Sequence, residues 1–191
     1  GVMDEDLLNI LKQSGMTTLA VPAEYGGPGL DLLTVALVTE EIAKGCAGVA
    51  TVCAANSLAS FPVVVAGSEE QKKEYFDCLN KGGMACFALT EPGAGSDAGA
   101  VACKAKKVEG GYLLNGTKCF ITNAPIADKI TLFANTREFG GIRGLTVFLS
   151  LWWIEIHRAL QLAKKKTRWV SEHLLHLKSF LMTASCRQRL W

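Results

Sequence analysis

The chain has 191 residues, 49% of them hydrophobic and 20% charged, and carries a formal net charge of +2. This composition is typical of a globular protein with a sizeable core, and it excludes an intrinsically disordered chain. The seven cysteines form no C-x-x-C pair and all three histidines follow residue 150, so no metal site is expected.

The cysteine count and the first residues indicate the type of cellular compartment. An odd cysteine count without a secretion signal is typical of reduced thiols in a cytosolic type of compartment. The first residues, GVMDED, resemble a truncated or processed beginning. We expect no membrane span, because Asn56, Ser57 and Pro62 interrupt the longest apolar run, around residues 47–66.

The first part of the chain, residues 1–82, is predicted to be helical. Residues 4–14 place their leucine and isoleucine side chains on one stripe, and Gly15 is suited to end that helix. Asp31 can cap a second helix, which is expected to stop at Gly45.

A long apolar segment and a capping motif follow. Residues 47–67 are apolar almost all round, which predicts a buried helix, a break at Pro62 and a further buried piece. Ser68 and Gln71 match a capping box that opens a helix over residues 69–80.

From Met84 the hydrophobic period becomes that of strands. Residues 84–90, MACFALT, form a short β-type run, and two turn signals follow, Gly110-Gly111 and Asn115-Gly116. Two further strands are predicted over residues 127–136 and 142–150. The fold class is therefore predicted as α+β, with an all-α domain (1–82) followed by a truncated antiparallel β-barrel or β-sandwich domain (83–150).

The composition changes abruptly near residue 150. Residues 1–150 contain 12 Lys or Arg and 16 Asp or Glu, whereas residues 151–191 contain 8 and 2, which gives net charges of −4 and +6. All four tryptophans lie in the second segment. We interpret residues 151–191 as a basic tail of different origin from the rest of the chain.

The segment CFALTEPGAGSDAGA, residues 86–100, holds a glycine loop with three possible roles. It could be a plain turn between strands. Gly93-x-Gly95-x-x-Ala98 also satisfies a Rossmann fingerprint, but that pattern needs a helix after the loop, and hairpin signals follow here instead. Third, main-chain N–H groups with the hydroxyls of Thr90 and Ser96 could hold a phosphate or flavin, flanked by aromatic rings.

The loop resembles the signature of the acyl-CoA dehydrogenase family at ALTEPGAGSDAGA. The likeness extends in register to PAEYGGPGLDLLT, NSLASFPVVVAGSEEQKKEY and NGTKCFITNA, and it covers about residues 4–149. The resemblance implies FAD-dependent α,β-dehydrogenation of acyl-CoA thioesters, with electrons passing to an electron-transfer flavoprotein. It also implies a C-terminal four-helix domain, a homotetramer, and a bacterial cytoplasmic or mitochondrial matrix location, with no nucleic acid or membrane partner.

Site residues carried over from the resemblance fall into two groups. Substrate contacts are expected at Ser96 and, lining the acyl cavity, at Thr51, Ala54 and Leu58, for which core packing is an equally good explanation. Many relatives carry tryptophan where this chain has Phe120. Stacking against the flavin ring is expected to survive this difference, but the indole N–H is lost. Flavin contacts are expected at Phe87, Ala88, Leu89, Thr90, Gly95, Ser96, Phe120, Ile121 and Thr122.

No catalytic residue is predicted within this chain. Removal of the weakly acidic α-proton needs a positioned base, and in the family this is a glutamate of the C-terminal helical domain, which would lie beyond residue 191. The resemblance implies structural roles for Glu91 and Asp97. We therefore expect a chain that is inactive and binds FAD weakly.

The tail admits two interpretations. As written, it is a basic amphipathic segment that could bind an anionic surface and make the chain a non-catalytic binding module. Alternatively, it is an off-frame translation, because a one-base register shift converts Trp152-Trp153 only to Val, Trp169-Val170 only to Gly and Met182-Thr183 only to Asp, as the family pattern requires. In that case we expect the later strands of the β-domain to be missing. A related flavoprotein oxidase or hydroxylase remains a further alternative.

Overall fold

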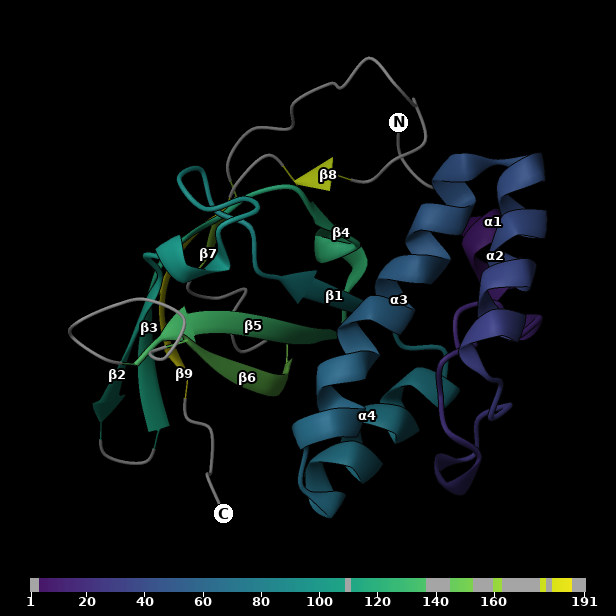
Figure 1. Cartoon of the computed structure of the whole chain (residues 1–191), viewed down its shortest axis with the longest axis horizontal. Coiled ribbons are helices and arrows are strands. Elements are labelled where there is room, and N and C mark those ends of the chain that lie inside the picture. The colour runs from purple at the N-terminus through teal and green to yellow at the C-terminus, as the bar shows by residue number, and fades with distance from the viewer. Residues whose placement is uncertain are drawn as a thin grey trace.

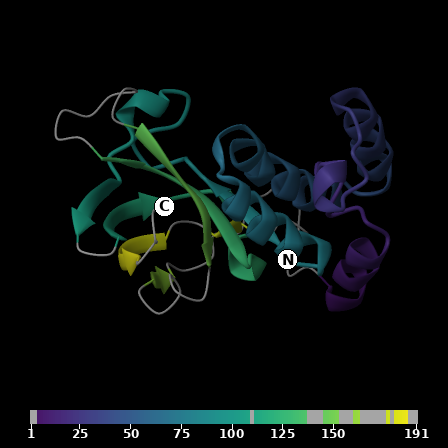
Figure 2. The ribbon, with the colours of Figure 1, turned by 90° about the horizontal axis from the view of Figure 1, so that it is seen from below.

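The computed structural model describes residues 4–108, 111–136, 145–152, 160–162, 176–177 and 180–186. Four α-helices gather on one side and a curled sheet lies on the other, as the α+β prediction requires (Figure 1). Seen from below, α1 and α2 lie farthest from the sheet, and α3 and α4 lie between them and the strands (Figure 2). The helices are α1 (Glu5–Gln13), α2 (Leu32–Gly45), α3 (Ala47–Ala66) and α4 (Glu69–Asn80).

Side-chain caps define where these helices begin. Asp4 accepts hydrogen bonds from the backbone N–H groups of Asp6 and Leu7, and Asp31 accepts one from that of Thr34. The predicted capping box of Ser68 and Gln71 is present in both directions. Each cap satisfies backbone donors that the first helical turn leaves without an intrahelical acceptor.

Helix α3 corrects the predicted break at Pro62, because it runs through this proline without interruption. Ala59 and Val63, on either side of it, are fully buried in a cluster with residues of α4. We attribute the continuity to this packing, which offsets the loss of one backbone hydrogen bond. By length and mean hydropathy (1.8), α3 is the one helix among the described residues that could cross a membrane, and 56% of its apolar window is buried inside the fold.

The sheet is mixed. Strands β1 (Ala85–Ala88) and β2 (Lys104–Val108) both pair in parallel with β5 (Lys129–Asn135), whereas the other pairings are antiparallel. The remaining strands are β3 (Gly111–Lys118), β4 (Ile121–Thr122), β6 (Leu145–Trp152), β7 (Leu160–Leu162), β8 (His176–Leu177) and β9 (Phe180–Cys186). The strand order in the sheet is β1-β5-β2-β3-β9-β7. Strand β6 also pairs with β5, and β4 and β8 form a separate pair.

The second predicted turn, at Asn115-Gly116, is wrong. Both residues lie inside β3 and pair with β2 or β9. Gly116 has a different purpose, because a Cβ there would lie 2.6 Å from the Cα of Cys103. The glycine therefore permits close approach of two backbones rather than a turn.

The tail contributes β7 and β9 to the sheet, and the prediction that an off-frame tail leaves the family's later strands missing stays a prediction. Strand β9 pairs with β3 from Tyr112 opposite Cys186 to Lys118 opposite Phe180, and β7 pairs with β9. An edge strand presents backbone N–H and C=O groups that any extended segment can satisfy, whatever its side chains. This pairing therefore carries no information on how the tail arose.

Candidate functional site

A cavity of about 550 Å³ opens where α2 and α3 meet the ends of β1 and β4. One wall is helical, and the opposite wall is made by the loop after β1 and the segment around β4. Among the residues with described side chains, none that lines this cavity is ionisable. The lining residues are Val35, Thr39, Thr51, Ala54, Ala55, Ser57, Leu58, Phe61, Phe87, Thr90, Phe120 and Thr122.

The cavity brings together most of the residues carried over from the resemblance. All three predicted acyl-chain residues lie along its helical wall. Four of the predicted flavin residues form the opposite wall. In chain order these seven are Thr51, Ala54, Leu58, Phe87, Thr90, Phe120 and Thr122.

The other predicted site residues lie elsewhere. Ala88 and Ile121 are buried in the core of the sheet, and Leu89 packs against the same core. Gly95 and Ser96 are exposed and do not line the cavity. The loop is held away at this point by a two-way backbone bridge between Glu91 and Ala94.

Sequence reasoning missed the contribution of α2 and part of α3. Val35 and Thr39 are four residues apart and so share one face of α2, and Phe61 extends the α3 wall. The α2 spacing was visible in the sequence. Its orientation was not, because it depends on how α2 packs against α3.

The second wall has an unusual backbone. Phe120 and Asn123 are the two non-glycine residues with positive φ in the described chain, at 59° and 66°. Phe120 remains 53% exposed beside the cavity, whereas Asn123 is fully buried. The Asn123 side-chain amide donates to the carbonyls of Val52 (2.9 Å) and Ala85 (3.2 Å), which explains how this left-handed turn is held.

Glu91 and Asp97 make structural contacts. Glu91 is almost fully buried and forms a 2.8 Å ion pair with Lys118. Asp97 accepts a 2.9 Å hydrogen bond from the backbone N–H of Gly99 and starts a single 3-10 turn at Ala98–Ala100. Over the described residues 98–108, the glycine loop is followed by this turn and β2 and not by an α-helix, so the structure excludes the Rossmann interpretation.

A planar flavin ring is compatible with the chemistry of this cavity. Apolar and aromatic side chains alternate there with the hydroxyls of Thr90 and Thr122. The residues present therefore fit FAD at this place.

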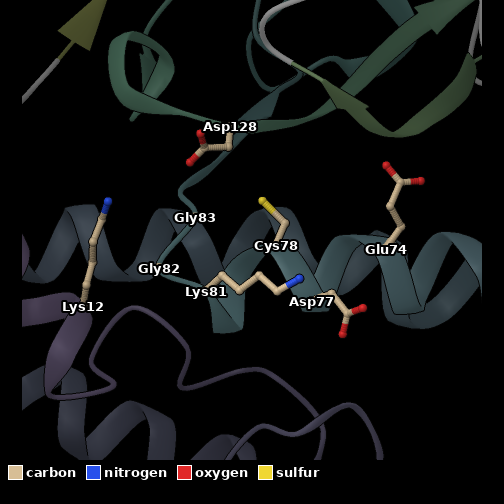
Figure 3. Close-up of a pocket in the computed structure, with 8 residues that line it drawn as sticks. All are labelled: Lys12, Glu74, Asp77, Cys78, Lys81, Gly82, Gly83 and Asp128. Carbon is tan, nitrogen blue, oxygen red and sulfur yellow. The ribbon is translucent and has the colours of Figure 1, made fainter.

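A second cavity, of about 500 Å³, lies at the C-terminal end of α4 (Figure 3). Charged side chains of both signs surround it, but Asp128 accepts a backbone hydrogen bond from Met84 and Glu74 pairs with Lys129. Burial raises the pKa of the Cys78 thiol there. It holds none of the predicted site residues, and the described residues contain no cluster suited to a metal ion. Its lining is Lys12, Glu74, Asp77, Cys78, Lys81, Gly82, Gly83 and Asp128.

Curated relatives resemble the chain over about its first 150 residues. The 3-(aryl)acrylate reductase of Clostridium sporogenes is 43% identical over 148 residues, which are 76% of this chain and 39% of the relative. The human mitochondrial short-chain specific acyl-CoA dehydrogenase is 42% identical over 137 residues, 71% of this chain and 33% of that protein. The caffeyl-CoA reductase-Etf complex subunit CarC of Acetobacterium woodii is 38% identical over 152 residues, 78% of this chain and 40% of that protein.

Solved structures share the fold. Butyryl-CoA dehydrogenase from Megasphaera elsdenii superposes with a TM-score of 0.86 at 33% identity, over 96% of this chain and 48% of that one. An acyl-CoA dehydrogenase from Bacillus anthracis, complexed with FAD, gives 0.80 at 31% identity, over 94% of this chain and 31% of that one. The chain thus spans less than half the length of these proteins.

The family models divide the chain into two parts. Residues 1–83 match the acyl-CoA dehydrogenase N-terminal domain, and residues 86–151 match the middle domain. Over residues 1–151 the chain therefore belongs to the acyl-CoA dehydrogenase family.

Proposed function

We propose that the chain is the N-terminal and middle part of an FAD-dependent acyl-CoA dehydrogenase, and that the 550 Å³ cavity is its share of the active site. One observation supports this most strongly. Seven residues carried over from the family motifs line a single cavity, although they come from α3, β1, the glycine loop and β4.

Each wall of the cavity has a distinct proposed role. Phe87 and Phe120 supply apolar surface for the faces of the flavin ring, and the Thr90 and Thr122 hydroxyls can hydrogen-bond to its polar edge. The α3 wall, at Ala54 and Leu58, takes the acyl chain and excludes water from it. The chemistry that bound FAD would supply there is that of a hydride acceptor for the β-carbon of an acyl-CoA thioester.

The chain by itself is proposed to lack dehydrogenase activity. Removal of the α-proton needs a base within hydrogen-bond reach, and none of the cavity-lining residues with described side chains is ionisable. In the intact parent, the base, much of the CoA site and the tetramer contacts would come from the C-terminal helical domain. Electron-transfer flavoprotein as partner and a bacterial cytoplasmic or mitochondrial matrix location belong to the same proposal.

Residues 151–191 are proposed to be an off-frame continuation. The family match ends at residue 151, where the composition changes. Independent sequencing of codons 145–155 tests this. An additional or missing base is expected, and a confirmed uninterrupted frame would contradict it.

A second candidate reaction is supported by the relatives. Two of the three described above are named reductases. The same cavity in the intact parent could therefore serve reduction of an α,β-unsaturated acyl substrate. Assaying the intact parent in both directions separates the two reactions.

Titration with FAD, followed by quenching of flavin fluorescence, tests the proposed site. Phe120→Ala is expected to weaken binding by about fivefold, since aromatic stacking contributes ~1 kcal/mol. Leu113→Ala is the matched control, because Leu113 is an exposed apolar residue of β3 outside the cavity. Equal affinities of both variants and the unmodified chain would refute the proposed location.

A further inference from the structure

The two segments that form the sheet-side wall of the cavity are joined by one buried lysine. Lys118 ends β3, immediately before the segment that carries Phe120 and Thr122, and its side chain is fully buried. Its Nζ donates to the carbonyl oxygen of Leu89 and to Oε1 of Glu91, both at 2.8 Å. Both acceptors belong to the loop after β1.

The residues next to Lys118 and Glu91 extend this connection. The backbone N–H of Cys119 donates to the carbonyl of Thr90 at 2.9 Å, so three consecutive loop residues are held by two consecutive residues of the other segment. The Glu91 carboxylate also accepts from the backbone N–H groups of Ala102 (2.7 Å) and Cys103 (3.0 Å). The ion pair is therefore hydrogen-bonded to the backbone on both sides of the loop.

A buried ion pair needs a reason other than stability. Removing two charges from water opposes their attraction, and apolar residues of similar volume often stabilise a fold as well or better. A lysine has a long side chain with several N–H donors, so it can hydrogen-bond to one carbonyl and one carboxylate at the same time. Thr90, between those two acceptors, is the residue that faces the cavity.

We propose that Lys118 is a positioning residue that sets the separation and orientation of segments 89–91 and 119–122, which together form the sheet-side wall of the flavin cavity. This rests on the proposed function for its ligand, but the clamp itself is a property of the fold. Loss of the lysine should make both segments more mobile, while the rest of the sheet keeps its pairing.

Lys129 provides a matched control. Among the lysines with described side chains it is the other fully buried one, and its Nζ pairs with Oε1 of Glu74 on α4 at 2.6 Å, beside the second cavity. Lys118→Met and Lys129→Met therefore remove the same kind of side chain from an ion pair at two different places.

Amide hydrogen exchange of the whole chain, read by mass spectrometry, tests the clamp. In Lys118→Met, exchange in segments 89–91 and 119–122 is expected to rise together, by about tenfold or more, with β5 unchanged. In Lys129→Met, these two segments should keep the exchange rates of the unmodified chain. Unchanged exchange in Lys118→Met, or an equal rise in Lys129→Met, would overturn the proposal.

FAD titration of the same proteins separates this proposal from the proposed function. Lys118→Met is expected to bind FAD at least about tenfold more weakly than Lys129→Met. If the unmodified chain binds no FAD but the coupled exchange is seen, the clamp stands and the proposed function fails. If FAD binds equally to both variants, the positioning role fails.

A milder variant covers the case in which Lys118→Met does not fold. Glu91→Gln retains an oxygen that can accept from the backbone of Ala102 or Cys103 but removes the charge that faces Lys118. The same two segments are expected to exchange faster, by a smaller factor. Exchange identical to that of the unmodified chain would then contradict the clamp.

Discussion

Asn56, in the middle of α3, connects three separate segments of the fold. Its Nδ2 donates to the carbonyl of Thr17 (3.0 Å), and its Oδ1 accepts from the backbone N–H of Ala85 (2.8 Å) and from Asn123 (3.3 Å). The side chain is fully buried. Asn56→Ala leaves at least two buried backbone groups without these partners, and each costs about 1–3 kcal/mol.

We therefore expect Asn56→Ala to lower the free energy of unfolding by about 3–5 kcal/mol, and Tm by about 10 °C for a chain of this size. Urea and thermal unfolding followed by circular dichroism measure both quantities. Asn80→Ala is the control, because Asn80 makes an exposed bond to the carbonyl of Tyr25 and should lose no more than about 1 kcal/mol. Losses of similar size in the two variants would refute this account of the helix–sheet junction.

Three further predictions concern other parts of the fold. Gly116→Ala should destabilise by about 1–3 kcal/mol in urea unfolding, because its Cβ would clash with the backbone of Cys103; an unchanged midpoint would contradict this. The hydrogen bond to Glu69 raises the pKa of Tyr25 to about 12, so its stabilising effect is present below pH 10 and lost as the pH rises towards 12. Glu69→Gln should bring that pKa back towards 10 in an NMR titration, and no change would count against the contact. Among the six cysteines with described side chains, half-buried Cys46 should react fastest with a thiol reagent, and Cys103, whose pKa burial raises to about 11, should react much more slowly.

The helical part of the fold was predictable because its signals are local. Asp31 and Ser68 cap the helices that they were expected to cap, since a cap depends on residues only two or three positions away. Pro62 misled because the packing that carries α3 through it involves residues of α4, which are distant in sequence. Gly116 misled for the same reason, since the backbone it accommodates belongs to another segment.

The site was predictable only through motif resemblance. Nothing local to Phe87 or Thr122 indicates that they face one cavity, because that depends on how β1 and β4 are brought together. Ser96 lies outside the cavity, beyond a backbone bridge between Glu91 and Ala94 that the motif does not reveal. Lys118 looks in the sequence like an ordinary polar strand residue, and its burial appears only in the folded chain.

The central claim is that FAD binds between the loop after β1 and the segment around β4. Amide hydrogen exchange with and without saturating FAD tests this location directly. We predict protection confined to residues 87–91 and 119–122. Protection instead at residues 78–83, beside the second cavity, or no protection in either place, would contradict the claim.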